Sequence, residues 1–201
     1  MANQPVSVVI VAGGRSRRMG RDKRQLRLWG NDQPNLLERT VQLAQQFSDD
    51  VLAVLNDPEA WQYLNVHMLP DRYPDTGALG GMATGLAVAR HDWSLVLASD
   101  MPMLNRDFLQ TLLDLPRHTQ AIVPCLDPQT TRNHAGWQPL CALYHRSCLN
   151  AFQTALNHNQ LAISAALNQL DVTPFHVPAE CQQALLNVNT VEDVARVNGK
   201  Q

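Results

Sequence analysis

The sequence is short of the features that mark several classes of protein. Its 201 residues carry a net charge of -2, so no overall basic field would attract nucleic acid. No apolar run approaches the ~20 residues of a membrane span, and we expect neither a signal peptide nor a membrane contact. The four cysteines show no Cys-x-x-Cys spacing. We therefore expect no zinc knuckle, no disulfide framework and a cytoplasmic location.

Nothing in the sequence divides it into parts. It has no internal repeat, no low-complexity tract and no linker rich in Gly, Ser or Pro. Hydrophobic residues make up 45% and charged residues 17%, which is typical of a globular protein. We expect a single domain over residues 1–201, long enough to bury roughly 70% of the surface of its unfolded chain. No coiled-coil pattern or interface stripe is visible, and we expect a monomer.

Short apolar runs alternate with amphipathic segments along the chain. The predicted strands are 7–11, 51–55, 66–69, 95–98, 121–123 and 140–144, and the predicted helices are 35–46, 82–89, 108–113, 148–156 and 190–197. This alternation predicts a three-layer α/β sandwich with a mostly parallel, Rossmann-like sheet. Ligands of such sheets bind beyond the carboxyl ends of the strands. Functional residues are therefore expected directly after Val11, Leu55, Leu69 and Ala98.

The segment after the first predicted strand combines glycine with positive charge. Residues 12–23 read A-G-G-R-S-R-R-M-G-R-D-K and hold five of the 16 Lys and Arg residues. Backbone N–H groups of a glycine loop can surround an anion, and Arg and Lys add charge where phosphate oxygens lie. The spacing fits neither the Walker A loop nor the dinucleotide fingerprint. The segment predicts a polyphosphate-binding loop. The alternative is a solvated basic loop, which could also touch RNA. Proteins that bind single-stranded RNA commonly stack its bases on aromatic side chains, and aromatic residues are only 5% of this chain.

This segment, directly after a strand, resembles the A-G-G-x-S-x-R-M-G-x-D-K signature of MobA-like nucleotidyltransferases, and among them the molybdenum cofactor guanylyltransferases. Four later segments resemble family motifs in the same order: Asp71 with 77–81 (D…G-P-L-x-G), 99–102 (C-D-x-P), 138–144 (x-x-P-L-x-A-L-Y) and 187–193 (N-V-N-T-P-E-D). The resemblance runs from residue 8 to about residue 195. Ala78, Ser99 and Val191 stand where the family usually has Pro, Cys and Pro. None of these departures removes a charged or metal-binding group.

The resemblance implies roles for particular residues. The candidate binding residues are Val11, Ala12, Gly13, Arg18, Lys23, Asn56, Asp71, Asp100, Asn187 and Asn189. The first three would meet the guanine and ribose of GTP, largely through their backbone. Lys23, with Arg18 as the second choice, would contact the phosphates. Asn187 and Asn189 would orient phosphates or pterin.

Lys23 and Asp100 are the candidate catalytic residues. Asp100 ends an apolar strand next to the expected phosphates, which suits a ligand of Mg²⁺, a cation that takes one or two carboxylates, waters and phosphates. The alternative for Asp100 is a helix N-cap. Turn chemistry is the corresponding alternative for Asn56 and Asp71.

The resemblance implies a Mg²⁺-dependent transfer of GMP from GTP to molybdopterin, with or without molybdenum, that releases pyrophosphate and forms molybdopterin guanine dinucleotide. Family guanylyltransferases tend to read A-G-G where cytidylyltransferases read A-A-G, which favours guanine. A molybdopterin cytidylyltransferase, a sugar-phosphate nucleotidyltransferase and a non-catalytic carrier are the alternatives. The partners implied are the molybdenum-inserting enzyme and the recipient molybdenum oxidoreductases.

Overall fold

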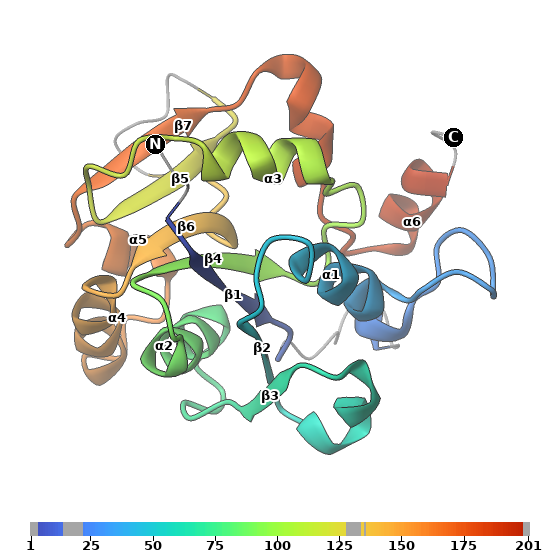
Figure 1. Ribbon diagram of the computed structural model, residues 1–201, viewed down its shortest axis with the longest axis horizontal. Helices are drawn as coiled ribbons and strands as arrows, with labels where there is room; N and C mark the ends of the chain where they lie inside the picture. Colours follow the sequence, from blue (N-terminus) through green and yellow to red (C-terminus); the bar gives the residue numbers. More distant parts are fainter. Residues whose placement is uncertain (1–3, 14–21, 128–133, 135, 199–201) are drawn as a thin grey trace.

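One twisted sheet organises the molecule (Figure 1). The structure is a computed structural model that describes residues 4–13, 22–127, 134 and 136–198. In chain order the elements are β1 (Val6–Val11), the 3-10 helix η1 (Lys23–Gln25), α1 (Leu36–Ala44), β2 (Val51–Leu55), the 3-10 helix η2 (Pro58–Leu64), β3 (His67–Pro70), α2 (Ala78–Val88), β4 (Trp93–Ala98), α3 (Arg106–Leu113), β5 (Ala121–Cys125), β6 (Cys141–His145), α4 (Cys148–Asn157), α5 (Ile163–Leu167), β7 (Val172–His176), the 3-10 helix η3 (Ala179–Leu185) and α6 (Val191–Asn198).

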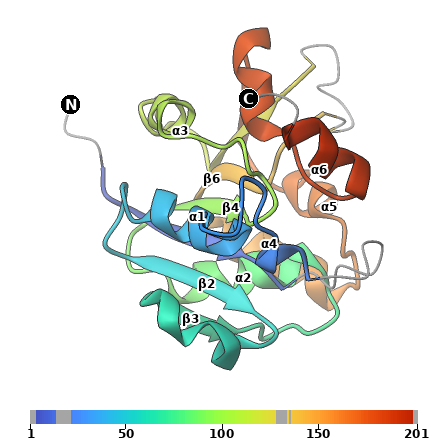
Figure 2. The ribbon, with the colours of Figure 1, turned by 90° about the vertical axis from the view of Figure 1, so that its right-hand side faces the viewer.

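The seven strands lie in the order β3-β2-β1-β4-β6-β5-β7. Only β6 runs antiparallel to its neighbours, and the other pairs are parallel. Helices α1 and α3 cover one face and α2 and α4 the other, as Figures 1 and 2 show, and each face has its own buried apolar cluster. The predicted three-layer α/β sandwich with a mostly parallel sheet is confirmed. Across the described residues, no helix has the length and apolarity to cross a bilayer.

The predicted elements are present, most with shifted ends. β2 has the predicted bounds, and α1 begins one residue after its predicted start because Asn35 is its N-cap. The Asn35 side chain accepts from the Glu38 N–H at 2.9 Å, while Glu38 accepts from the Asn35 N–H at 2.7 Å. The segment β7 was not predicted, because it is a half-exposed edge strand that contains Pro174 instead of an apolar run.

The prediction that a helix starts at Met82, after a glycine pair, is wrong. Helix α2 begins at Ala78, so its glycines lie inside the helix. Two of them, Gly81 and Gly85, face strand β1: a Cβ atom on Gly81 would lie 2.8 Å from Val11 Cγ1, and one on Gly85 would overlap Val9 Cγ1. The glycines are there because the helix packs against the strand more closely than any larger side chain permits.

We expect Gly85→Ala to destabilise the protein by about 1–3 kcal/mol, because the new methyl group overlaps buried Val9. Helix propensity alone predicts the opposite sign, a gain of about 1 kcal/mol. Urea unfolding of both proteins measures the difference. The control repeats Gly85→Ala in a Val9→Ala background, where the overlap is gone and the penalty should largely disappear. An equal penalty in both backgrounds would contradict the close-packing explanation.

Candidate functional site

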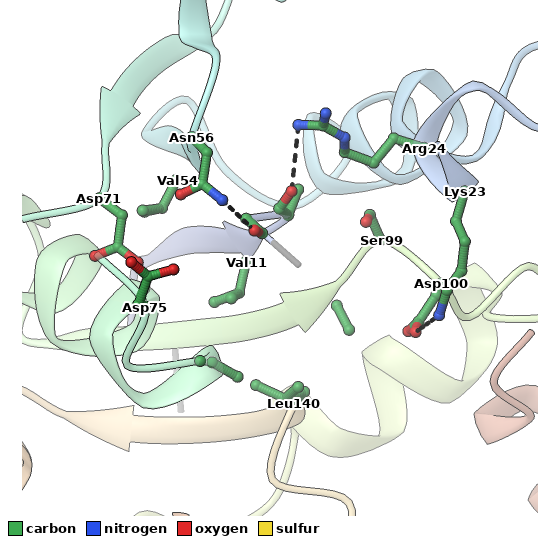
Figure 3. Close-up of a pocket in the computed structure, with 16 residues that line it drawn as sticks. Val11, Lys23, Arg24, Val54, Asn56, Asp71, Asp75, Ser99, Asp100 and Leu140 are labelled. Carbon is green, nitrogen blue, oxygen red and sulfur yellow. Dashed lines mark hydrogen bonds and ion pairs between the residues drawn. The ribbon is translucent and has the colours of Figure 1, made fainter. Parts of the chain in front are cut away.

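A cavity of about 380 Å³ opens where β1, β2, β3 and β4 end (Figure 3). The parallel pairing of these four strands brings their carboxyl ends to one edge of the sheet. Seven predicted site residues line the cavity: Val11, Ala12, Gly13, Lys23, Asn56, Asp71 and Asp100. The expectation that ligand-binding residues gather after these strands agrees with the place of the cavity.

Lys23 and Asp100 form an ion pair at one side of the cavity. The Lys23 Nζ atom lies 3.5 Å from Asp100 Oδ2, with the two side chains 19% and 27% exposed. Lys23 also donates to Asn189 Oδ1 at 2.6 Å. Burial raises the pKa of Asp100 above its ordinary value, and the neighbouring Lys23 ammonium opposes that rise. The cluster therefore places a cation and a carboxylate together at the end of the predicted phosphate loop.

The start of α6 fixes Asn189 beside Lys23. The Asp193 carboxylate accepts from the backbone N–H groups of Asn189 and Thr190, both at 2.9 Å, and Thr190 Oγ1 accepts from the Asp193 N–H at 3.2 Å. This reciprocal arrangement is a capping box at the start of the helix. The Val188 N–H donates to the Asp100 carbonyl at 2.9 Å. Hydrogen bonds on both sides of Asn189 thus hold the C-terminal segment against the cavity.

The opposite side of the cavity carries amide and carboxylate groups. Asn56 Nδ2 donates to the Gly13 carbonyl, which ties the end of β1 to the end of β2. Asp71 Oδ1 accepts from the Tyr73 N–H at 2.9 Å and from the buried Thr84 hydroxyl at 3.1 Å. Figure 3 shows Asn56, Asp71 and Asp75 across the cavity from Lys23 and Asp100. One side of the cavity thus carries an ammonium beside a carboxylate, and the other carries an amide and two carboxylates.

Two of the predicted residues, Asn187 and Asn189, do not line the cavity. Asn189 contacts Lys23, and Asn187 is half-buried. Arg18 lies outside the described residues. The roles predicted for all of the site residues remain predictions.

Several residues that line the cavity were not predicted as site residues, among them Arg24, Asp75, Ser99 and Leu140. Arg24 follows Lys23 and carries the same charge, so no pattern distinguished it from the other loop cations. Asp75 lies in the same loop as Asp71 and lines the cavity with a left-handed φ of 62°. Ser99, 9% exposed, precedes Asp100, and Leu140 precedes β6. Ser99 and Leu140 lie within the segments 99–102 and 138–144 that resemble family motifs, and this was the available signal.

The acidic groups fit a cation that takes few protein ligands. Within the described part of the chain, no group of three or more His, Cys, Asp and Glu residues could hold a metal ion. Asp100 offers one carboxylate that faces the cavity beside Lys23. Mg²⁺ commonly binds through one or two carboxylates, with waters and substrate phosphates as its other ligands. The residues present therefore fit Mg²⁺ bound together with a nucleotide.

Comparison with known proteins gives a consistent result. Residues 8–175 match the model of the MobA-like NTP transferase domain. A protein of Chloroflexus aggregans named probable molybdenum cofactor guanylyltransferase is 40% identical over 96% of this chain and 93% of its own length. A Nostoc protein with the same name is 31% identical over 97% of this chain and 91% of its own.

A solved structure shows the same fold. It is the molybdopterin-guanine dinucleotide biosynthesis protein A of Archaeoglobus fulgidus, which superposes with a TM-score of 0.79, covers 96% of this chain and 97% of its own, and is 22% identical. The sequence matches span nearly the whole chain and include the strands that end at the cavity. The chain belongs to the MobA-like NTP transferase family.

Proposed function

We propose that this protein is a molybdenum cofactor guanylyltransferase. A phosphate oxygen of molybdopterin forms a bond to the α-phosphorus of GTP, and the bond from that phosphorus to the β-phosphate oxygen breaks. Pyrophosphate leaves, and molybdopterin guanine dinucleotide is the product. The observation that best supports this proposal is a single cavity lined by Lys23, Asp100, Asn56 and Asp71. It occurs in a chain that is 40% identical to a protein named probable molybdenum cofactor guanylyltransferase.

In this proposal Lys23 and Asp100 would face the reacting phosphates. The attacking phosphate is already an anion, so no general base is needed, and catalysis reduces to positioning and charge stabilisation. The Lys23 ammonium would move from Asp100 and Asn189 to the phosphate oxygens that gain charge as pyrophosphate leaves. Asp100 would hold Mg²⁺, which supplies positive charge to the phosphate oxygens when bound. The Lys23–Asp100 pair keeps both groups in place before the nucleotide arrives.

The other side of the cavity suits a nucleoside. The backbone of Val11, Ala12 and Gly13 passes along the cavity, and the Asn56–Gly13 hydrogen bond fixes its course. Asp71, held by Tyr73 and Thr84, presents a carboxylate that accepts hydrogen bonds from ribose hydroxyls or from the N–H groups of guanine. Cytosine also has an amino donor, so this chemistry favours guanine less than the sequence relatives do. Cytidylyl transfer is therefore the alternative that the experiment must address.

The cellular setting forms part of the same proposal. The protein would act as a cytoplasmic monomer, take its pterin from the molybdenum-inserting enzyme and pass its product to molybdenum oxidoreductases. Only the family resemblance supports these partners.

Thermal unfolding with each of GTP, CTP, ATP and UTP, in Mg²⁺ and in chelator, tests the proposal. Ligand at 100 times its Kd should add about 2.7 kcal/mol of stability. We expect stabilisation by GTP with Mg²⁺ and a smaller effect with chelator. A turnover assay with GTP and molybdopterin then follows pyrophosphate release. Stabilisation by CTP with cytidylyl product would move the protein to the cytidylyltransferases, and binding without turnover would favour a carrier.

A further inference from the structure

Arg24 makes hydrogen bonds to three partners around the site. Its Nε donates to Asp22 Oδ1 at 2.9 Å, and its Nη2 donates to Asp22 Oδ2 at 2.6 Å and Asp57 Oδ2 at 2.8 Å. Its Nη1 donates to Asp57 Oδ1 at 2.5 Å and to the Ala12 carbonyl at 3.4 Å. The guanidinium also lies 5.2 Å from the centroid of the buried Trp61 ring. We call this group of contacts the Arg24 clamp.

The clamp uses the whole guanidinium. Arginine has five N–H donors, and all three guanidinium nitrogens donate here, with the Nε–H shared between both Asp22 oxygens. The side chain is only 13% exposed although Arg24 lines the cavity. Two carboxylates around one guanidinium also leave a net negative charge next to a site proposed for a polyphosphate. Arg24 is therefore poorly suited to bind phosphate directly.

The clamp instead joins three separate segments. Ala12 follows β1, Asp57 lies between β2 and η2, and Asp22 caps η1 by accepting from the Arg24 N–H at 3.0 Å. Asp22 and Arg24 flank Lys23 on both sides. Bidentate contacts between guanidinium and carboxylate fix orientation as well as distance. The backbone from which the Lys23 side chain extends is thus anchored to the sheet.

We propose that Arg24 is a positioning residue that acts through Lys23. A lysine side chain has four rotatable bonds and cannot set the place of its own ammonium, so its backbone must be held if the charge is to meet the reacting phosphates. The clamp holds that backbone, while Asp100 and Asn189 receive the ammonium. This inference rests on the proposed function for its catalytic consequence, but the geometry that it predicts can be measured without turnover.

The first measurement compares Arg24→Gln in two backgrounds. In the wild-type background we expect kcat for guanylyl transfer to fall about tenfold, with little change in KM for GTP, because misplacement of a catalytic group lowers the rate of the chemical step. In a Lys23→Ala background Arg24→Gln should lower kcat no further. Arg117→Gln is the matched control: Arg117 is half-buried, lies 5.5 Å from the Trp93 ring at the other end of β4, and should leave kcat unchanged.

The second measurement needs no activity. The chain has only two lysines, Lys23 and Lys200. Labelling with an amine-reactive reagent followed by peptide mass spectrometry therefore measures the reactivity of Lys23, with Lys200 as the internal reference. We expect the Lys23-to-Lys200 labelling ratio to rise several-fold in Arg24→Gln and to stay unchanged in Arg117→Gln. Asp57→Ala, which removes one side of the clamp and keeps the cation, should raise the ratio as well. Melting temperatures identify any variant that fails to fold, and Asp57→Ala then replaces Arg24→Gln.

The outcomes separate the two proposals. A wild-type protein without guanylyl transfer overturns the proposed function, whereas an unchanged labelling ratio in folded Arg24→Gln and Asp57→Ala overturns the clamp. A tenfold loss of kcat that persists in the Lys23→Ala background shows that Arg24 acts independently of Lys23. If Arg24→Gln raises KM for GTP while Asp57→Ala lowers it, Arg24 binds phosphate directly and the positioning role is wrong.

Discussion

Asp100→Asn is expected to lower kcat/KM for guanylyl transfer by on the order of 10²-fold or more, the effect of removing a preorganised electrostatic group. Asparagine keeps the shape and a hydrogen-bonding oxygen but loses the charge that binds Mg²⁺ and faces Lys23 at 3.5 Å. Initial rates over a range of Mg²⁺ concentrations measure the loss. A rate that stays within a few-fold of wild type would remove Asp100 from the metal site.

Stability distinguishes this loss from misfolding. Because burial raises the pKa of Asp100, the folded protein holds that proton more tightly than the unfolded chain. Ionising Asp100 therefore lowers the free energy of unfolding as pH rises from the ordinary carboxyl range through the raised pKa. In metal-free buffer, Asp100→Asn should lack this decline and be at least as stable as wild type near neutral pH. Asp92→Asn, an exposed carboxylate paired with Arg146 just before β4, is the control and should keep full activity.

The sequence predicts well which strands end at the cavity, because these strands are short apolar runs with polar residues directly after them. The apolar run that ends at Val11 is typical of a central strand. In the structure it is β1, which is buried between β2 and β4, and its end therefore lies between the ends of those two strands. Lys23 and Asp100 could be predicted from the motifs that contain them. Their 3.5 Å approach could not, since it depends on the course of the chain after β1.

The parts that could not be predicted are those set by partners distant in sequence. Arg24 has the charge of a loop cation, and only its hydrogen bonds to Asp57, 33 residues away, show that its guanidinium is fully paired. Asn189 reaches Lys23 across 166 residues. Helix α2 was predicted to start too late because glycine lowers helix propensity, whereas close packing on Val11 makes Gly81 favourable. Local preference gives way to tertiary packing in each of these cases.

Lys23→Ala is expected to cost on the order of 10²-fold or more in kcat, with a smaller effect on GTP binding, because the ammonium stabilises charge that develops as pyrophosphate leaves. Single-turnover rates and the GTP-dependent rise in melting temperature measure the two effects separately. Lys23→Arg keeps the charge but replaces a compact ammonium with a planar fork, so it should recover part of the rate. Weaker GTP binding with an unchanged single-turnover rate would mean that Lys23 binds the ground state and the transition state equally.

The ion pair gives Lys23→Ala a second signature that does not depend on substrate. Lys23 opposes the burial that raises the pKa of Asp100, so its removal should raise that pKa further and increase the cost of a charged Asp100 at neutral pH. The metal-free variant should then lose stability more steeply than wild type as pH rises, by on the order of 1 kcal/mol or less for a partly exposed pair. Adding Asp100→Asn should recover the lost stability, because the buried carboxylate charge that Lys23 compensates is then absent. If the double variant keeps the full loss, the two side chains are not coupled, and Lys23 and Asp100 must be treated as separate contributors to the site.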